Sequence, residues 1–264
     1  MPLGDFEREV LRLLAGNRHP DSFVGGATVL HQSATSPRAS KDVDYFHDTI
    51  ESLAASVQCD AGTLRSAGYE VELSPAQDTF QRALLRRGRQ QTKVEWVFDS
   101  AFRFFPVERD LELGWRLNFW DAATNKMLAF AGRSKLRDLV DVLYLHDQHL
   151  HIGALAWAAA GKDPGMTPES IIQWARRNAI YRQEELQDLQ LGSPVTLPQL
   201  KSRWMEASQS ALELIAQLPP AELGCLYLNT AGQPVCPDPN APGFQKLTRH
   251  FGSVKGAWPR IAEG

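Results

Sequence analysis

Gly25-Gly26 and the later stretch Arg38-Ala39-Ser40-Lys41-Asp42-Val43-Asp44 carry the most information about the fold of this chain. Ser22–Val24, directly before the glycines, has the composition of a short strand, and Ala27–Gln32 after them that of a helix start. From Lys41 to Phe46 polar and apolar residues alternate, which is the period of a half-buried strand. We therefore expect a strand, a tight turn, a helix and a second strand, in that order.

The second of these strands carries two carboxylates. Side chains alternate between the two faces of a strand, so Asp42 and Asp44 project from one face, about 6–7 Å apart. Carboxylates that close repel each other unless a cation lies between them, and Mg²⁺ is bound by one or two carboxylates together with phosphate oxygens. The backbone N–H groups of Gly25 and Gly26 can approach a phosphate closely, with the next helix presenting its positive end, and the Ser40 hydroxyl can donate to a phosphate oxygen. An isolated pair of aspartates is more often simply solvated, but the order of these features favours a metal and phosphate site.

The rest of the chain follows the same reading. Phe6, Val10 and Leu14 recur at helical spacing. Further expected helices cover Asp48–Ala67, a stretch from Asp121 onward, a stretch after an N-cap at Ser134, Thr167–Asn178 and Leu197–Leu218. Further expected strands cover Tyr69–Leu73, Phe80–Leu84 and Thr92–Phe98. A late hairpin is expected near Ala231-Gly232. Strands crowd the first 120 residues and helices the next 100. This order predicts an α+β protein with a mixed sheet flanked by helices in residues 1–115, a helical lobe in 116–218 and a loop-rich extension in 219–264.

Composition excludes several classes of protein. The chain has 264 residues, of which 43% are hydrophobic and 22% charged, an ordinary globular balance. Its formal net charge of −3 excludes a protein that binds nucleic acid through its overall charge. The longest mostly apolar run, Ile152–Gly161, is far shorter than the ~20 residues that span a bilayer. The first seven residues lack the features of a signal peptide. Three cysteines without a C-x-x-C pair do not form a disulfide framework or a zinc site. We expect a soluble, cytoplasmic protein.

Two later segments extend the pattern begun at Gly25. They are Asp121-Ala122-Ala123-Thr124-Asn125-Lys126 and Arg133-Ser134-Lys135-Leu136-Arg137-Asp138. The glycine pair followed by a carboxylate pair resembles the signature of polymerase-β-type nucleotidyltransferases. The later segments resemble the D-x-x-x-x-K and R-x-x-x-R-D motif of AbiEii-type nucleotidyltransferases, toxins of bacterial toxin–antitoxin and phage-defence systems that are similar to the MenT enzymes. The resemblance covers about residues 22–145.

The resemblance implies roles for individual residues. Asp42 and Asp44 would hold the metal, and Glu95 would complete the carboxylate set or act as a base, with Asp99 as a rival for that place. Lys126 would be the cationic partner of the triphosphate, and Asp138 an active-site carboxylate. The nucleotide-binding residues would be Gly25, Gly26, Arg38, Ser40, Lys126 and Arg133. Independently, Arg133 is suited to bidentate phosphate contacts, although a surface ion pair between Arg137 and Asp141 is the alternative reading of the last motif.

The implied reaction is the Mg²⁺-dependent transfer of a nucleoside monophosphate from an NTP to a hydroxyl, with RNA, and the tRNA 3′ end in particular, as the acceptor. The implied biological role is that of a toxin with a cognate antitoxin. Two other functions stay open: a nucleotidyltransferase that modifies a small molecule such as an antibiotic, and a catalytically inactive relative that binds a partner.

A cluster of basic residues bears on the acceptor. Five of them lie within twelve residues around Gly88: Arg82, Arg86, Arg87, Arg89 and Lys93. On a hairpin they would form a basic finger suited to a phosphate backbone. An ordinary solvated turn is the alternative.

Overall fold

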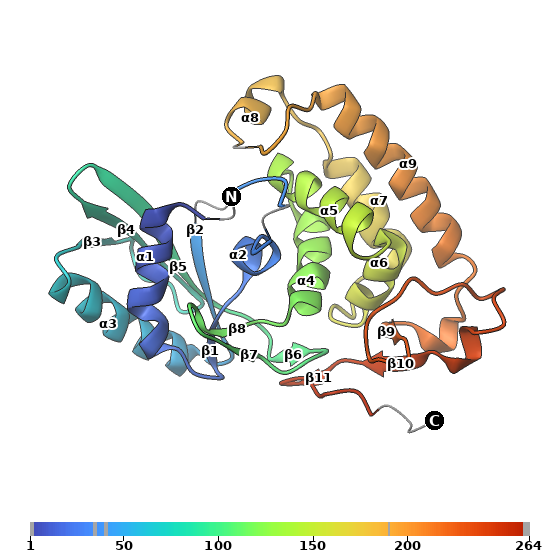
Figure 1. Ribbon diagram of the computed structural model, residues 1–264, viewed down its shortest axis with the longest axis horizontal. Coiled ribbons are helices and arrows are strands. Elements are labelled where there is room, and N and C mark those ends of the chain that lie inside the picture. Colours follow the sequence, from blue (N-terminus) through green and yellow to red (C-terminus); the bar gives the residue numbers. More distant parts are fainter. Residues whose placement is uncertain (1–2, 34–35, 40–41, 190, 261–264) are drawn as a thin grey trace. The chain divides into compact units, whose positions relative to one another are not determined.

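The structure of the chain is a computed structural model that describes residues 3–33, 36–39, 42–189 and 191–260. The chain divides into two compact units (Figure 1). Unit 1 comprises residues 1–101 and 106–122, and unit 2 comprises residues 102–105 and 123–264. The expected boundaries at 115/116 and 218/219 remain predictions.

Unit 1 is built on a seven-stranded mixed sheet, in agreement with the expected α+β class. The strand order is β3-β4-β5-β2-β1-β8-β7. Strand β2 runs parallel to β5 and β1 parallel to β8, whereas the other neighbours are antiparallel. The strands are β1 (Ser22–Val24), β2 (Asp42–His47), β3 (Glu70–Leu73), β4 (Phe80–Arg87), β5 (Gln90–Phe98), β7 (Glu108–Asp110) and β8 (Gly114–Arg116).

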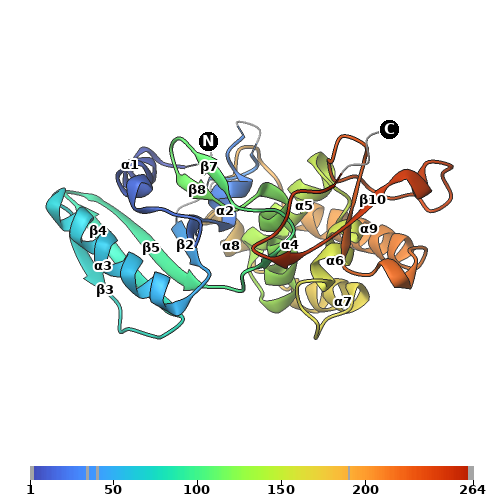
Figure 2. The same cartoon turned by 90° about the horizontal axis from the view of Figure 1, so that it is seen from below.

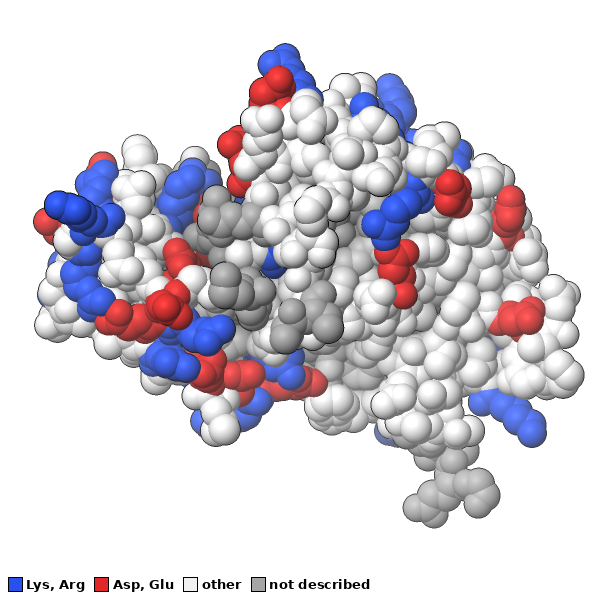
Figure 3. Space-filling model, turned by 45° about the horizontal axis from the view of Figure 1, so that its top comes forward, with Lys and Arg blue, Asp and Glu red and all other residues white. Residues whose placement is uncertain are grey.

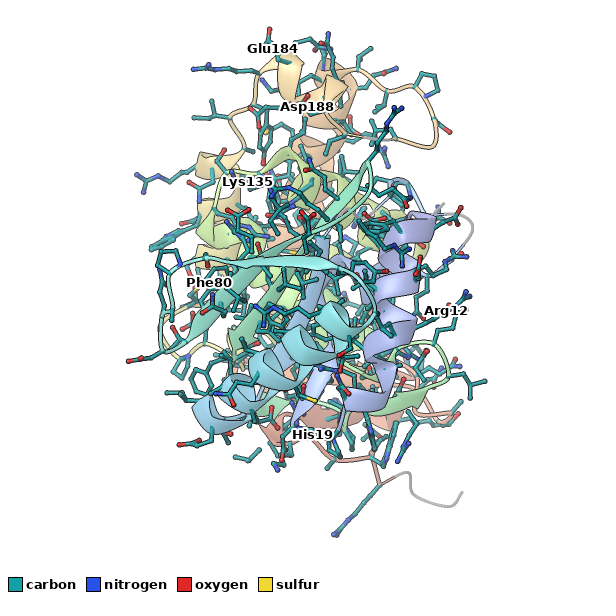
Figure 4. The ribbon with its side chains drawn as sticks, turned by 90° about the vertical axis from the view of Figure 1, so that its left-hand side faces the viewer. Arg12, His19, Phe80, Lys135, Glu184 and Asp188 are labelled. Carbon is teal, nitrogen blue, oxygen red and sulfur yellow. The ribbon has the colours of Figure 1, made fainter. Side chains whose placement is uncertain are left out.

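Helices α1 (Asp5–Leu14) and α3 (Ile50–Ser66) pack against one face of this sheet. Figure 4 views unit 1 from this side, with Arg12 marking α1 and Phe80 the start of β4. The covered face carries buried apolar side chains such as Tyr45 and Trp96, each fully buried. Because side chains alternate along β2, Asp42 and Asp44 project from the opposite face. The remaining helical segments of unit 1 are η1 (Ala15–Asn17) and α2 (Gly26–Leu30).

Strands β4 and β5 form the hairpin expected around Gly88. The turn needs glycine there, because Gly88 has a φ of +62°. Both strands extend further toward the turn than the sequence predicted. The short hairpin of β7 and β8 was not predicted, because β7 consists of charged residues and β8 has a single apolar residue, whereas the equally short β1 has two apolar residues before the glycine pair.

Unit 2 is mainly helical (Figures 1 and 2). Its helices are α4 (Phe119–Gly132, which begins in unit 1), α5 (Leu136–Gln148), α6 (Ile152–Ala160), α7 (Pro168–Asn178), α8 (Gln183–Gln187) and α9 (Leu197–Ile215). The apolar run noted in the sequence is α6, every residue of which is buried, as expected for a helix that is hydrophobic all round. None of the helices in the described residues combines the length and apolar character that crossing a membrane requires.

The predicted N-cap at Ser134 is wrong. Lys135 occupies the cap position of α5, and no side chain caps the helix there. The Ser134 hydroxyl instead donates to the carbonyl oxygen of Ile180 at 3.1 Å. A tertiary contact with the segment after α7 therefore takes the hydroxyl that a local cap would have used.

Short strands complete unit 2. They are β6 (Phe102–Arg103), β9 (Cys225–Leu228), β10 (Thr248–Phe251) and β11 (Ser253–Val254), with 3₁₀ turns η2 (Pro220–Glu222) and η3 (Phe244–Lys246). The expected turn at Ala231-Gly232 is present, with a φ of +74° at Gly232. However, β9 forms its ladder with the distant β10, and only Leu228 bridges to Pro234 across the turn. All three cysteines are free.

Candidate active site

Strand register in unit 1 brings three of the predicted carboxylates together. Asp44 on β2 lies directly opposite Glu95 on the parallel strand β5, and Asp42 lies opposite Lys93. Residues in register on neighbouring strands share a face, about 4.8 Å apart. Asp42, Asp44 and Glu95 are all half-buried on the face that α1 and α3 leave uncovered.

The glycine pair lies against Asp44. The N–H of Gly25 donates to the carbonyl oxygen of Asp44 at 3.1 Å. A Cβ on Gly25 would lie 2.4 Å from the ring of Phe46, and a Cβ on Gly26, whose φ is +62°, would lie 2.7 Å from Oδ2 of Asp44. A side chain at either position would therefore have to displace the Phe46 ring or the Asp44 carboxylate, and at Gly26 the backbone conformation also favours glycine.

Strand register distinguishes Glu95 from Asp99, the two candidates for the third carboxylate of the site. Asp99 lies just beyond the end of β5, four residues after Glu95 and thus about 13 Å further along the chain. Its Oδ1 accepts a hydrogen bond from the N–H of Ser100 at 2.8 Å. Of the two, Glu95 is the neighbour of Asp44.

Two further predicted residues lie in the loop before β2. Arg38 is buried and donates to the carbonyl oxygen of Ala39 at 3.1 Å. Within the described part of this loop, the Ser36 hydroxyl donates to the carbonyl oxygen of Arg38 at 3.0 Å and lies 2.7 Å from Nδ1 of the buried His31. Ser40 lies outside the described residues.

The carboxylates of unit 1 fit a hard divalent cation in chemistry, since Asp42 and Asp44 offer oxygen ligands from one face. Nevertheless, within the residues that the structure describes, no three carboxylate, histidine or cysteine side chains converge closely enough to hold a metal ion. Glu95 is engaged elsewhere: its Oε1 accepts from Nε of Arg82 at 2.8 Å and pairs with Nη2 at 2.7 Å.

The later motif residues form a second charged cluster, in unit 2. Nζ of Lys126, on α4, lies 2.8 Å from Oδ1 of Asp138 and 3.0 Å from Oδ2 of Asp141, both on α5. Arg133, from the connection between these helices, donates to Asp138 through Nε at 2.8 Å. Lys126 is 7% exposed and both aspartates are fully buried, whereas the Arg133 side chain is 46% exposed.

The electrostatics of this cluster centre on Asp138. Burial alone would raise the pKa of Asp138, but the positive charges and hydrogen bonds of Lys126 and Arg133 outweigh burial and lower the pKa. Sequence reasoning did not select Asp141 as a site residue, but considered it as a surface partner of Arg137. Asp141 is three residues after Asp138, on the same face of α5, and this spacing was the signal that both carboxylates face one partner.

The basic residues of the β4–β5 hairpin are largely paired with acidic ones. Besides Arg82 with Glu95, Arg86 pairs with Glu72 at 2.9 Å, and Arg87 donates to Glu9 through Nη1 at 2.6 Å. Arg89 and Lys93 are exposed. On the face shown in Figure 3, the part formed by unit 1 accordingly carries basic and acidic side chains side by side rather than a patch of one sign.

A mixed sheet that presents a glycine turn and in-register carboxylates on one face is the arrangement that the sequence resemblance implied for a nucleotidyltransferase. Residues 12–215 match the model of a protein family described as nucleotidyl transferase AbiEii toxin, type IV TA (toxin–antitoxin) system. The chain therefore belongs to the AbiEii family, as the sequence motifs predicted. Membership implies an NTP as substrate and an antitoxin as partner.

Solved structures share the fold. The nucleotidyltransferase toxin MenT4 of Mycobacterium tuberculosis H37Rv aligns with a TM-score of 0.56 at 15% identity, over 82% of this chain and 83% of that one. A candidate nucleotidyltransferase from H. pylori aligns with a TM-score of 0.51 at 18% identity, over 81% of this chain and 94% of that one. Comparison with curated protein sequences found no significant match.

Proposed function

We propose that this nucleotidyltransferase moves a nucleoside monophosphate from an NTP to a hydroxyl of RNA, with the tRNA 3′ end as the acceptor, and that it uses Mg²⁺. The observation that carries the proposal is the register of Asp44 with Glu95 beside the Gly25-Gly26 turn. This arrangement combines hard oxygen ligands with a backbone that can approach a phosphate.

In the proposed reaction the acceptor oxygen attacks the α-phosphorus, the bond from that phosphorus to the bridging oxygen breaks, and pyrophosphate leaves. Asp42 and Asp44, with Glu95, would hold Mg²⁺, which when bound lowers the charge barrier to attack and stabilises the leaving oxygen. Glu95 is the proposed acceptor of the hydroxyl proton. The enzyme otherwise contributes positioning and charge, as phosphoryl-transfer chemistry requires.

In unit 2 we propose Lys126 and Arg133 as phosphate-binding cations. Lys126 is held between two buried carboxylates, which fixes the position of its ammonium group but also balances its charge. Arg133 is the more accessible of the two. A guanidinium on a half-exposed side chain suits bidentate contact with a phosphate.

One observation favours a second candidate acceptor. Because Arg82, Arg86 and Arg87 already pair with carboxylates, the hairpin offers fewer uncompensated charges to an RNA backbone than the sequence indicated. A small molecule with a hydroxyl group is therefore the alternative acceptor.

The test is to incubate the purified protein with Mg²⁺ and each of the four labelled NTPs, with total tRNA and, separately, with small hydroxyl acceptors such as aminoglycosides. We expect labelled tRNA with the wild type and none with Asp44→Asn. Asp78→Asn, a change of the same kind at an exposed loop position, is the matched control and should retain activity. Label only on the small acceptors would favour the alternative, and no label on any acceptor would contradict the proposal.

A further inference from the structure

Arg82 and Asp44 lie on opposite sides of Glu95. In the strand order β4-β5-β2, Arg82 on β4 and Asp44 on β2 are each in register with Glu95 on β5, so the three side chains form one row across the uncovered face of the sheet. Both contacts from Arg82 go to the same oxygen, Oε1. The guanidinium therefore contacts the Glu95 carboxylate from the β4 side, whereas Asp44 lies on the β2 side.

The contact between Arg82 and Glu95 places a positive charge beside the carboxylates, as a bound metal ion would. Two carboxylates on neighbouring strands repel each other, and a cation beside one of them relieves that repulsion. Arg82 supplies the cation from the β4 side. Arg82 thus occupies an oxygen of Glu95 that a metal ion at Asp42 and Asp44 would need as a further ligand.

The ion pair between Arg82 and Glu95 is weak enough to break. The Arg82 side chain is 48% exposed and that of Glu95 is 21% exposed, and an ion pair in contact with water contributes little net free energy. In this paired conformer the Arg82 guanidinium lies 5.3 Å from the ring centroid of Phe80, a contact that adds to the closed state.

We propose that Arg82 is a positioning residue that competes with the divalent cation for Glu95, so that Glu95 becomes a full ligand only when the guanidinium turns away. The inference rests on the proposed metal site at Asp42 and Asp44. It adds a built-in competitor that weakens metal binding in the absence of substrate.

The experiment measures Mn²⁺ affinity without nucleotide, by isothermal titration calorimetry and by the electron paramagnetic resonance signal of free Mn²⁺. Arg82→Met keeps the aliphatic stem and removes the charge, whereas Arg82→Lys keeps the charge. We expect Arg82→Met to bind Mn²⁺ up to about fivefold more tightly than the wild type, which is the order of effect of one exposed ion pair, and Arg82→Lys to stay closer to the wild type.

Arg86→Met is the matched control. Arg86 lies on the same strand and pairs with Glu72 at 2.9 Å with a 44% exposed side chain, but it lies four residues away from the carboxylate row. Its substitution should leave Mn²⁺ affinity within about twofold of the wild type. A similar gain in Arg86→Met would mean that general surface charge is responsible, and would overturn the proposal.

Glu95→Gln completes a double-mutant cycle. If Arg82 acts through Glu95, Arg82→Met has no effect on Mn²⁺ affinity in the Glu95→Gln background. Unchanged or weaker binding in Arg82→Met, with binding still lost in Asp44→Asn, would overturn the competition alone. No Mn²⁺ binding in any variant would overturn both the competition and the proposed metal site, whereas tighter binding in Arg82→Met without nucleotide transfer would support the competition and contradict the proposed reaction.

Discussion

A Cβ atom on Gly26 would lie 2.7 Å from Oδ2 of Asp44, so a larger residue at this position has to displace the Asp44 carboxylate. Gly26 also has a φ of +62°, in the left-handed region that favours glycine. The turn and the carboxylate are thus parts of one packed arrangement. The position of the Asp44 carboxylate therefore depends on the small size of the residue at position 26.

Gly26→Ala should therefore reduce nucleotide transfer far more than it reduces stability. The new methyl group displaces the Asp44 carboxylate, and a displacement of about 1 Å at a catalytic group can cost on the order of 10²-fold in rate. The measurement is the rate of NMP transfer alongside the free energy of unfolding in urea. Gly68→Ala is the control, because Gly68 has a φ of +83° but no atom within 4 Å of the added Cβ. Equal loss of activity in both variants would show that backbone strain alone is responsible.

Lys126→Met should destabilise the protein by about 3–5 kcal/mol. The substitution leaves Asp138 and Asp141 buried, with the half-exposed Arg133 as the remaining cation of the cluster described above. The lowered pKa of Asp138 should rise toward its ordinary value. Urea unfolding measures the first effect, and NMR titration of the Asp138 carboxyl measures the second. A variant as stable as the wild type would mean that the cluster is not a structural ion pair.

Asp60→Asn should also destabilise unit 1, by about 3 kcal/mol or more. Asp60 pairs with Arg18, both side chains are fully buried, and the carboxylate also accepts from Nε1 of Trp96 at 2.7 Å. Removing the charge leaves the Arg18 guanidinium buried without its anion. Glu112→Gln breaks the exposed pair with Arg12 and should cost less than about 1 kcal/mol in the same urea experiment. Similar losses for the two variants would contradict the expected effect of burial.

The protein should lose stability as the pH falls from about 6.5 to about 4. Burial, and then the charge of Arg18, lower the pKa of His47 from 6.5 to about 4. Between these values the unfolded chain binds the proton and the folded chain does not, so protonation favours unfolding, by up to about 3 kcal/mol over the interval. His47→Gln should flatten this part of the stability profile, measured by urea unfolding at pH 7, 6, 5 and 4. An unchanged slope would exclude His47 as the cause.

Much of the fold follows from local patterns. The alternation of polar and apolar residues placed Asp42 and Asp44 on one face of a strand, and the helical spacing of Phe6, Val10 and Leu14 predicted α1, in which all three are buried. The hairpin around Gly88 was predicted for the same reason. Short strands without an apolar pattern were missed, as β7 and β8 show.

The site was predictable only in part, because several of its contacts join residues far apart in the sequence. The local i, i+4 rule suggested Asp141 as a partner of Arg137, and that pair stays a prediction. The rule does not contain the contact that the structure shows, between Asp141 on α5 and Lys126 on α4. The cap expected at Ser134 was likewise replaced by a contact with Ile180. Asp141 and Ser134 each contact a residue outside α5, and such contacts cannot be inferred from spacing within one helix.

By itself, the sequence determined that a glycine pair precedes the carboxylate strand and that Asp42 and Asp44 share a face, because side chains alternate along a single strand. Only the tertiary structure decided that Glu95 rather than Asp99 stands beside Asp44, and that Arg82 holds Glu95 from the other side. Strand register decides these points, and register is set by the packing of the whole sheet against its helices. No local pattern in β4 or β5 contains that information.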